Sequence, residues 1–146
     1  MADTKIIDEK VQALRRFKDR VDEIIIEEAK KQEEEILIMV KQEQLFQGID
    51  AQGRQISPPY AESTIKRKIK KGQPTDRVTL KDTGFFYFSF FIDYQPKEFT
   101  IQAEDIKTIF LLARYGLDIL GLTPDNIDKL SGLIRPELLK RLKGEL

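Results

Sequence analysis

The sequence predicts an α+β fold with long N-terminal helices, a small antiparallel β-hairpin or sheet, and C-terminal helices. Three observations predict it. Apolar side chains recur every three or four residues in much of residues 6–46, which is the period of an amphipathic helix. Residues 99–104 alternate strictly between apolar and polar, as a half-buried strand does. Thr123-Pro124-Asp125 is a strong helix start near the C-terminus.

The N-terminal helical region, residues 1–47, is expected to contain two helical pieces. The first carries one apolar stripe, made by Val11, Leu14, Phe17, Val21 and Ile24. Residues 27–35 then contain Ala29 as their one apolar side chain, before a dense apolar block begins at Ile36. We therefore expect a break or a protruding turn within residues 27–35, with the acidic side chains on a solvated helix face. Gly48 should end the region, because glycine readily adopts the left-handed conformation past a helix end.

The middle region, residues 48–105, is expected to form loops and a β-hairpin. Residues 50–53 predict a tight turn, with Asp50 as a side-chain acceptor and Gly53 at positive φ. A calcium loop is excluded, because Asp50 is the only carboxylate between Gly48 and Tyr60 and an EF-hand needs several. Residues 57–60 should be extended, since each proline fixes its own φ and restricts the residue before it.

A short helix at residues 61–69 is expected to lead into a basic loop at residues 66–71, followed by an irregular loop to Arg77. Thr83 should cap a second short helix that runs from Gly84 to about Phe90. A strand is the competing interpretation there, because residues 85–91 are aromatic and β-prone. The hairpin is expected to pair residues 91–94 with residues 99–104.

The C-terminal region, residues 106–146, is expected to be helical. Residues 106–114 are apolar at helical spacing, through Ile106, Ile109, Phe110 and Ala113. The helix that starts after Thr123 should face inward through Ile127, Leu130, Leu133 and Ile134. Pro136 either kinks this helix or opens a last one at residues 137–143. We expect the three regions to form a single domain, residues 1–146.

Composition limits the chemistry that is available. The chain has 25 basic and 25 acidic residues, which disfavours DNA binding over a whole face and leaves no long-range barrier to self-association. Cysteine and histidine are both absent, so disulfides, thiolate metal sites, the usual general base and the commonest zinc ligand are excluded. Asp125 and Asp128 are interpreted as helix cap and surface. We expect no cofactor, no signal segment and no membrane span, and thus a cytosolic or cytosol-assembled protein.

Two side-chain clusters are candidates for contact with a partner. The basic cluster is either a solvated loop or a subunit or DNA contact, and it comprises Lys66, Arg67, Lys68, Lys70 and Lys71. The aromatic cluster is expected to form core or subunit interface, and it comprises Phe85, Phe86, Phe88, Phe90 and Phe91 with Tyr87. No basic residue lies between Thr83 and Gln95, which argues against a stacking platform for single-stranded nucleic acid. Tyr60 and Tyr115 are expected to pack at element ends with exposed hydroxyls.

Four sequence pieces occur in an order that resembles a known family. They are Leu45-Phe46-Gln47-Gly48 with the turn that follows, Pro59-Tyr60-Ala61 leading to Thr64 and Lys66, Leu80 with Thr83-Gly84, Phe86 and Ser89, and Tyr115-Gly116 with Leu120-Gly121-Leu122-Thr123 and its capped helix. Together they resemble the phage virion morphogenesis family, which comprises the tail-completion or neck proteins of Mu-like phages and prophages. The resemblance covers about residues 40–142 on this count of motifs. Residues 117–120 differ from the family's usual run, so the subfamily stays open.

The resemblance implies a structural virion protein and no enzyme. Such a head–tail connector works as an oligomeric ring of identical copies, joins the tail to the portal-bearing head, and surrounds a lumen that passes DNA. The implied partners are copies of itself, portal or head-completion proteins and tail-tube or terminator proteins. The implied location is the neck of the virion, with assembly in the host cytoplasm.

The charge pattern supplies a hypothesis about the ring. A heterologous interface needs two different complementary patches on one chain. The acidic residues 27–35 and the basic residues 66–71 have opposite signs and meet this condition if they lie on neighbouring subunits; alternatively, the basic loop faces DNA in the lumen. A small nucleic-acid-binding module that uses residues 66–71 remains the alternative function. A metal-dependent hydrolase would need a carboxylate cluster, which the sequence does not show.

Overall fold

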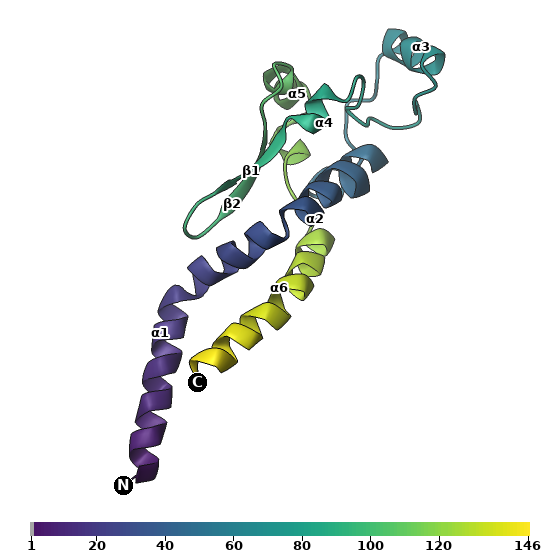
Figure 1. The fold of residues 1–146 in the computed structure, drawn as a ribbon. Coiled ribbons are helices and arrows are strands. Elements are labelled where there is room, and N and C mark those ends of the chain that lie inside the picture. The colour runs from purple at the N-terminus through teal and green to yellow at the C-terminus, as the bar shows by residue number, and fades with distance from the viewer. Residues whose placement is uncertain (1) are drawn as a thin grey trace.

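A computed structural model describes residues 2–146. Two long helices run antiparallel and side by side, and they form a stem from which the smaller elements extend (Figure 1). The stem helices are α1 (Ala2–Lys31) and α6 (Pro124–Glu145). The other helices and turns are α2 (Glu33–Ile38), the π-helix η1 (Met39–Gln44), the 3₁₀ turns η2 (Leu45–Gln47) and η3 (Leu117–Ile119), α3 (Glu62–Lys70), α4 (Phe85–Phe88) and α5 (Thr108–Tyr115). The strands β1 (Phe90–Tyr94) and β2 (Phe99–Ala103) form a hairpin, and the predicted α+β fold is confirmed.

The predicted break within residues 27–35 is confirmed at Gln32, whose φ of −101° and ψ of 15° separate α1 from α2. The acidic run around it is less solvated than predicted, because Glu28 is only 3% exposed. Its carboxylate accepts from Lys31 Nζ at 2.9 Å and from Arg141 of α6 at 3.2 Å. The break thus lies where α1 is fixed to α6 by ion pairs.

The apolar stripe of α1 is buried over only part of its length. Phe17 and Ile24 are 6% and 1% exposed, whereas Val11 and Leu14 are 38% and 44% exposed. The reason is visible in Figure 1, where the N-terminal part of α1 extends past the end of α6. Arg20 pairs with Glu145 at 3.2 Å near the point where α6 ends. On the N-terminal side of that contact Ala13 and Phe17 are still buried, whereas residues 4–12 are exposed.

The turn after Gly48 has the predicted form. Gly48 has φ of 77° and ends η2, and Gly53 has the same φ in the next turn. Asp50 Oδ1 accepts from the backbone amides of Gln52 and Arg54, at 2.9 and 3.0 Å. The side-chain acceptor and the positive φ are both confirmed.

The basic cluster is helical, so the predicted basic loop is wrong. Residues 66–70 belong to α3, Lys71 is its C-terminal cap, and Gly72 with φ of 69° ends the helix. Lysine and arginine are good helix formers, and residues 62–71 contain neither glycine nor proline. The helix therefore continues through the charged run, so the basic side chains point in different directions around the helix axis.

The aromatic cluster divides between core and solvent. Phe86, Tyr87 and Phe90 are buried, and the rings of Phe86 and Phe90 meet edge to face with centroids 4.9 Å apart. Phe85 and Phe88 are instead 65% and 84% exposed. Phe91 is half-buried on β1. The predicted core role is confirmed for Phe86, Tyr87 and Phe90, whereas a subunit interface at the exposed members stays a prediction.

Helix α4 begins one residue later than predicted. Gly84 has φ of 93°, and Thr83 Oγ1 accepts from the amide of Phe85 at 3.4 Å. The predicted strand pair is confirmed, with Ile92 opposite Ile101 in an antiparallel register, although β1 begins at Phe90. Both central isoleucines are 7% exposed and face the core.

The C-terminal helices bury fewer residues than predicted. Leu130 and Ile134 are buried, but Ile127 and Leu133 are 50% and 41% exposed, so their predicted inward orientation is wrong. Since α6 crosses the molecule as one continuous helix, a narrow stripe is enough to pack against α1. Pro136 lies inside this helix and opens no new one.

The junction of η1 and α6 is held by a buried polar network. Thr123 caps α6 as predicted and accepts from the amide of Asn126 at 3.2 Å. Gln44 of η1 donates to the carbonyl of Gly121 at 2.7 Å and accepts from Asn126 Nδ2 at 2.7 Å. Since Gln44 is 2% exposed, these bonds satisfy a polar side chain in the core and fix the start of α6.

Candidate functional site

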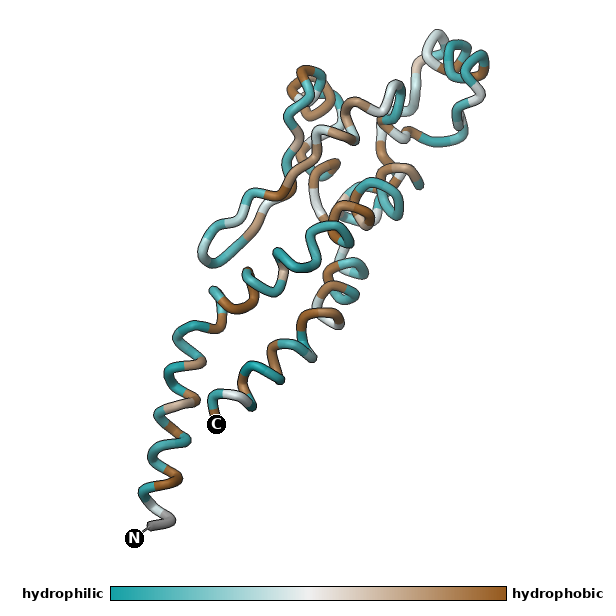
Figure 2. The backbone as a smooth tube through the Cα atoms, in the orientation of Figure 1, coloured by the Kyte–Doolittle hydropathy of each residue, from teal (hydrophilic) through white to brown (hydrophobic). Residues whose placement is uncertain are grey.

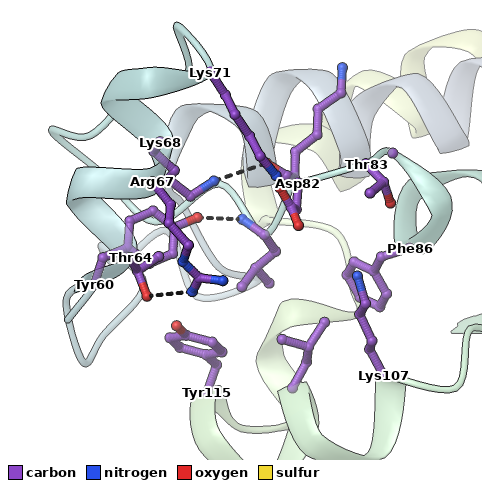
Figure 3. Close-up of a pocket in the computed structure, with 14 residues that line it drawn as sticks. Tyr60, Thr64, Arg67, Lys68, Lys71, Asp82, Thr83, Phe86, Lys107 and Tyr115 are labelled. Carbon is purple, nitrogen blue, oxygen red and sulfur yellow. Dashed lines mark hydrogen bonds and ion pairs between the residues drawn. The ribbon is translucent and has the colours of Figure 1, made fainter. Parts of the chain in front are cut away.

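A cleft of about 160 Å³ lies between α3, residues 80–84 and α5. Figure 3 shows side chains from both walls that converge on it, with Arg67 and Lys68 on one side and Lys107 and Tyr115 on the other. Five basic side chains line the cleft among the described residues, and Asp82 is the one acidic residue that does. The cleft is therefore positively charged although the chain as a whole is neutral.

Lys68 is the buried cation of this cleft. The residue is only 5% exposed, and its Nζ donates a hydrogen bond to the carbonyl of Lys81 at 3.0 Å. Nζ also lies 3.4 Å from Gln73 Oε1 and 4.7 Å from the centroid of the Tyr60 ring. These partners are neutral, and within residues 2–146 Lys68 forms no ion pair with a carboxylate. Burial of a charge without a counter-ion is unfavourable, so this lysine leaves the cleft electrostatically incomplete.

The other charged groups differ in how far they are neutralised. Lys71 Nζ lies 2.6 Å from Asp82 Oδ1, and this hydrogen bond holds the pKa of Asp82 below its usual value. Arg67 donates to the hydroxyl of Thr64 at 3.3 Å, a neutral partner. Lys107 stands on the opposite wall, on the residue before α5. The pair of Lys71 and Asp82 is thus balanced, while Arg67 and Lys107 add to the positive charge.

Two tyrosines hold the backbone at the edge of the cleft. The hydroxyl of Tyr60 accepts from the amides of Thr79 and Leu80, at 2.9 and 3.1 Å. The hydroxyl of Tyr87 donates to the carbonyl of Thr79, and burial raises the pKa of Tyr87. Leu80 has φ of +57°, an unusual conformation for a residue with a side chain. The predicted exposed hydroxyl is therefore wrong for Tyr60, whereas that of Tyr115 meets Arg114 Nε in an exposed bond of 3.2 Å.

The structure divides the predicted basic cluster. Arg67, Lys68 and Lys71 line the cleft, whereas Lys66 and Lys70 do not. Asp82, Lys107 and Tyr115 complete the cleft and were absent from the predicted contact set. Their sequence signal is weak, because α5 reaches the cleft only through the tertiary fold.

The acidic run is also used largely within the chain. Arg141 contacts Glu27 at 2.8 Å and Glu28 at 3.2 Å. Glu33 accepts from the hydroxyl of Tyr94 at 3.0 Å. Glu34 remains exposed. A contact between the whole acidic run and the whole basic cluster of a neighbouring copy, as hypothesised from the sequence, would have to break several of these bonds.

Large apolar side chains are exposed on α4 and around α5. We call Ile106, Ile109 and Phe110 the α5 ridge; they are 86%, 75% and 73% exposed. Ile109 and Phe110 are adjacent on α5, and Ile106 lies in the turn just before it. The segment at α5 is largely brown in Figure 2, and Leu111 and Leu112 in it pack toward the core.

A second apolar surface lies on the free part of α1. We call it the stem tip, and its exposed members are Ile6, Ile7, Val11 and Leu14. Ile7, Val11 and Leu14 recur at helical spacing and are exposed. The N-terminal part of α1 extends past the end of α6 (Figure 2). The chain thus carries exposed apolar surface both on the stem tip and on the α5 ridge.

The described residues contain no group of three or more Asp, Glu, His or Cys side chains placed to hold a metal ion. None of the helices in this part of the chain combines the length and the apolar character that crossing a bilayer requires.

Comparisons of the chain with protein-family models, with curated proteins and with solved structures find no match.

Proposed function

We propose that this chain is a structural virion protein of a tailed bacteriophage, a tail-completion or head–tail connector subunit that assembles as a ring of identical copies. The motif order supports the family, and one structural observation carries the assembly: large apolar side chains are exposed on two separate surfaces of one chain. In this proposal the protein works by contact with other virion components and catalyses no reaction.

The α5 ridge supplies one side of the proposed interface. Scattered apolar side chains are normal on a protein surface, but three large exposed ones within five consecutive residues favour a contact site. Burial of three such side chains would contribute roughly 5 to 9 kcal/mol before the entropy of association is subtracted. Phe85 and Phe88 of α4 add further exposed aromatic surface.

The stem tip supplies the other side. A closed ring needs two different surfaces on each subunit, and each must fit a surface of the neighbouring copy. The stem tip is part of an amphipathic helix, and its apolar side chains are exposed among the described residues. Such a helix is one of the recurring forms that dock into apolar surfaces. We therefore assign a second copy of the chain as its occupant, with the α5 ridge as the receiving surface.

The remaining partners follow from the same proposal. Portal or head-completion proteins would meet one face of the ring, tail-tube or terminator proteins the other, and DNA would pass through the lumen. The site of action would be the neck of the virion, after assembly in the host cytoplasm. The genes that flank the coding sequence should then include portal, capsid or tail-tube genes.

The solution mass of the purified chain tests the assembly. Native mass spectrometry and negative-stain imaging should show closed oligomers at micromolar concentration. The double change Ile109→Asp/Phe110→Asp should shift the mass to the monomer, while circular dichroism stays unchanged because neither side chain is in the core. Ile127→Asp on α6, half-exposed outside the ridge, should leave the oligomer intact. A wild-type chain that stays monomeric throughout, together with a locus that lacks virion genes, would contradict the proposal.

The alternative function is a small nucleic-acid-binding module, and the positive charge of the cleft favours it. Such a module would bind DNA or RNA with an affinity that falls steeply with salt. Arg67 and Lys107 would then contact phosphates, while Lys71 is already paired with Asp82. Binding of a short oligonucleotide at two salt concentrations separates this alternative from the connector.

A further inference from the structure

The cleft carries more positive than negative charge, because five basic side chains line it and Asp82, its one acidic side chain among the described residues, is paired with Lys71. Lys68 is only 5% exposed, and its partners are a backbone carbonyl, a side-chain amide oxygen and an aromatic ring. In water an ammonium group is fully solvated, so a buried one is stabilised strongly when an anion reaches it. A negatively charged group in the cleft would meet this requirement.

Two further cations would face the same anion. Arg67 and Lys107 extend into the cleft from opposite walls (Figure 3), and neither pairs with a carboxylate of the described residues. The planar guanidinium of arginine suits a carboxylate, to which it can donate two hydrogen bonds. Hydrogen bonds to charged groups are among the stronger ones in proteins, so this geometry favours an oxyanion over a neutral ligand.

The shape of the cleft limits what carries the anion. Its volume of about 160 Å³ is of the order of one side chain, and its walls include Phe86, Leu111 and the ring of Tyr115. A strand of nucleic acid presents a row of phosphates and binds along an extended basic groove. Here Lys66 and Lys70, which would extend such a groove along α3, do not line the cleft. The observations favour a single carboxylate on a hydrocarbon chain.

Part of the cleft wall is apolar. Phe86, Leu111 and Tyr115 line the cleft together with its basic residues. A ligand that places a carboxylate in the cleft could therefore pack an adjacent apolar group against these side chains. This combination is the chemistry of a glutamate or aspartate within an apolar stretch of a protein.

We propose that the cleft between α3 and α5 binds an acidic side chain from an acidic and apolar peptide segment of a partner protein. Lys68 supplies the buried charge, Arg67 and Lys107 hold the carboxylate at the mouth, and the apolar wall made by Phe86, Leu111 and Tyr115 contacts the neighbouring apolar group. This site goes beyond the proposed ring, because it specifies the chemistry of a ligand whose binding to the unassembled chain can be measured.

The test is a ¹H–¹⁵N NMR titration of the full chain at fixed ionic strength. The probe is the peptide acetyl-Leu-Glu-Glu-Leu-amide, and its matched control is acetyl-Leu-Gln-Gln-Leu-amide. We expect the acidic probe to shift the amides of residues 80–84 and of Lys107, and the amide probe to shift them far less. Equal shifts with both peptides, or no shift at the cleft, would overturn the proposal.

Two double variants separate the cleft from general electrostatics. Arg67→Gln/Lys107→Gln removes two charges from the cleft, and Lys66→Gln/Lys70→Gln removes two from the same region outside it. We expect the first variant to weaken the affinity for the acidic peptide about tenfold or more, which corresponds to about 1.4 kcal/mol. The second variant should leave this affinity nearly unchanged. Equal weakening by both would show long-range attraction only and would refute the site.

Lys68→Met tests the buried charge while it keeps the hydrocarbon chain in place. We expect this variant to fold and to lose binding of the acidic peptide. Undiminished binding by a folded variant would contradict the role of Lys68. If it does not fold, the two double variants still decide the proposal. A short single-stranded oligonucleotide that shifts the same amides at lower concentration than the acidic peptide would assign the site to nucleic acid and overturn the protein ligand.

Discussion

At the edge of the cleft, two tyrosine hydroxyls fix one short segment of backbone. Tyr60 accepts from two consecutive amides, of Thr79 and Leu80, and Tyr87 donates to the carbonyl of Thr79. Thr79 is 1% exposed, so water does not readily replace these partners. The positive φ of Leu80 is maintained in this way, and it directs residues 80–84 along the cleft.

Tyr60→Phe is expected to lower the free energy of unfolding by about 2 kcal/mol, because it leaves two buried amides without an acceptor. Urea denaturation followed by circular dichroism would measure the change. Tyr115→Phe is the matched control, since its hydroxyl accepts only from Arg114 in an exposed bond, and we expect it to change stability by less than about 0.5 kcal/mol. Equal effects of the two variants would show that the Tyr60 hydroxyl does not hold this segment.

The contact between α1 and α6 combines a narrow apolar stripe with ion pairs. Arg141 joins Glu27 and Glu28, and Lys31 also contacts Glu28. The hydrogen bond from Lys31 is the largest cause that lowers the pKa of Glu28, followed by that from Arg141, while burial opposes them. The carboxylate form is therefore favoured by the folded state, and Glu28 links the pH of the solution to the stability of the helix pair.

Glu28→Gln should lower the free energy of unfolding at pH 7 by about 1 to 2 kcal/mol, since it replaces charge-assisted hydrogen bonds with neutral ones. The pKa of Glu28 in the fold lies below its ordinary value of 4.5, so the stabilisation is present above pH 4.5 and is lost as the pH falls through the folded value. The difference between wild type and variant should thus shrink in acid. Urea titrations at pH 7 and pH 3 would measure it.

Glu34→Gln serves as the control for this comparison, because Glu34 is exposed on α2. We expect its effect to be small at both pH values. If Glu28→Gln lowers stability equally at pH 7 and in acid, the ionised carboxylate is not what stabilises the helix pair.

For the whole molecule, stability and assembly are expected to depend on different parts of the chain. The buried cluster draws on all three regions, for example through Ile36, Ile101 and Ile134. The stem tip contributes none of the buried residues of that cluster. Loss of the stem tip should therefore affect contacts between molecules more than the fold.

Deletion of residues 2–11 should leave the thermal midpoint within about 2 °C of wild type, because the described side chains removed are exposed and the ion pair of Arg20 with Glu145 remains. The deleted chain should lose self-association, as measured by native mass spectrometry. A large fall in the midpoint would show that the stem tip packs within its own molecule.

The sequence predicted the elements better than the surfaces. The hairpin, the turn at Asp50 and the cap at Thr123 were predictable because each depends on local chemistry, namely residue alternation, side-chain hydrogen bonds and proline placement. The break at Gln32 followed from a gap in the apolar stripe. The short helix predicted at residues 61–69 is confirmed by α3 to within one residue at each end. The basic loop predicted at residues 66–71 is wrong, because it was inferred from charge and helix propensity was given less weight.

The cleft was only partly predictable, since its walls come from distant segments. The charge run identified Arg67, Lys68 and Lys71, but burial of Lys68 depends on how residues 80–84 and Tyr60 pack around α3. Periodicity predicted that Ile106, Ile109 and Phe110 share one face of a helix. It cannot predict which face of a short helix packs against the core. Exposure of the α5 ridge is a property of the tertiary fold.

The antiparallel stem brings both ends of the described chain to the same end of the molecule, away from α3 and α5 (Figure 1). A bulky density marker fused at the C-terminus would therefore sit far from the cleft. In electron micrographs of an assembled particle, such markers would reveal whether the stems radiate outward or line the central opening.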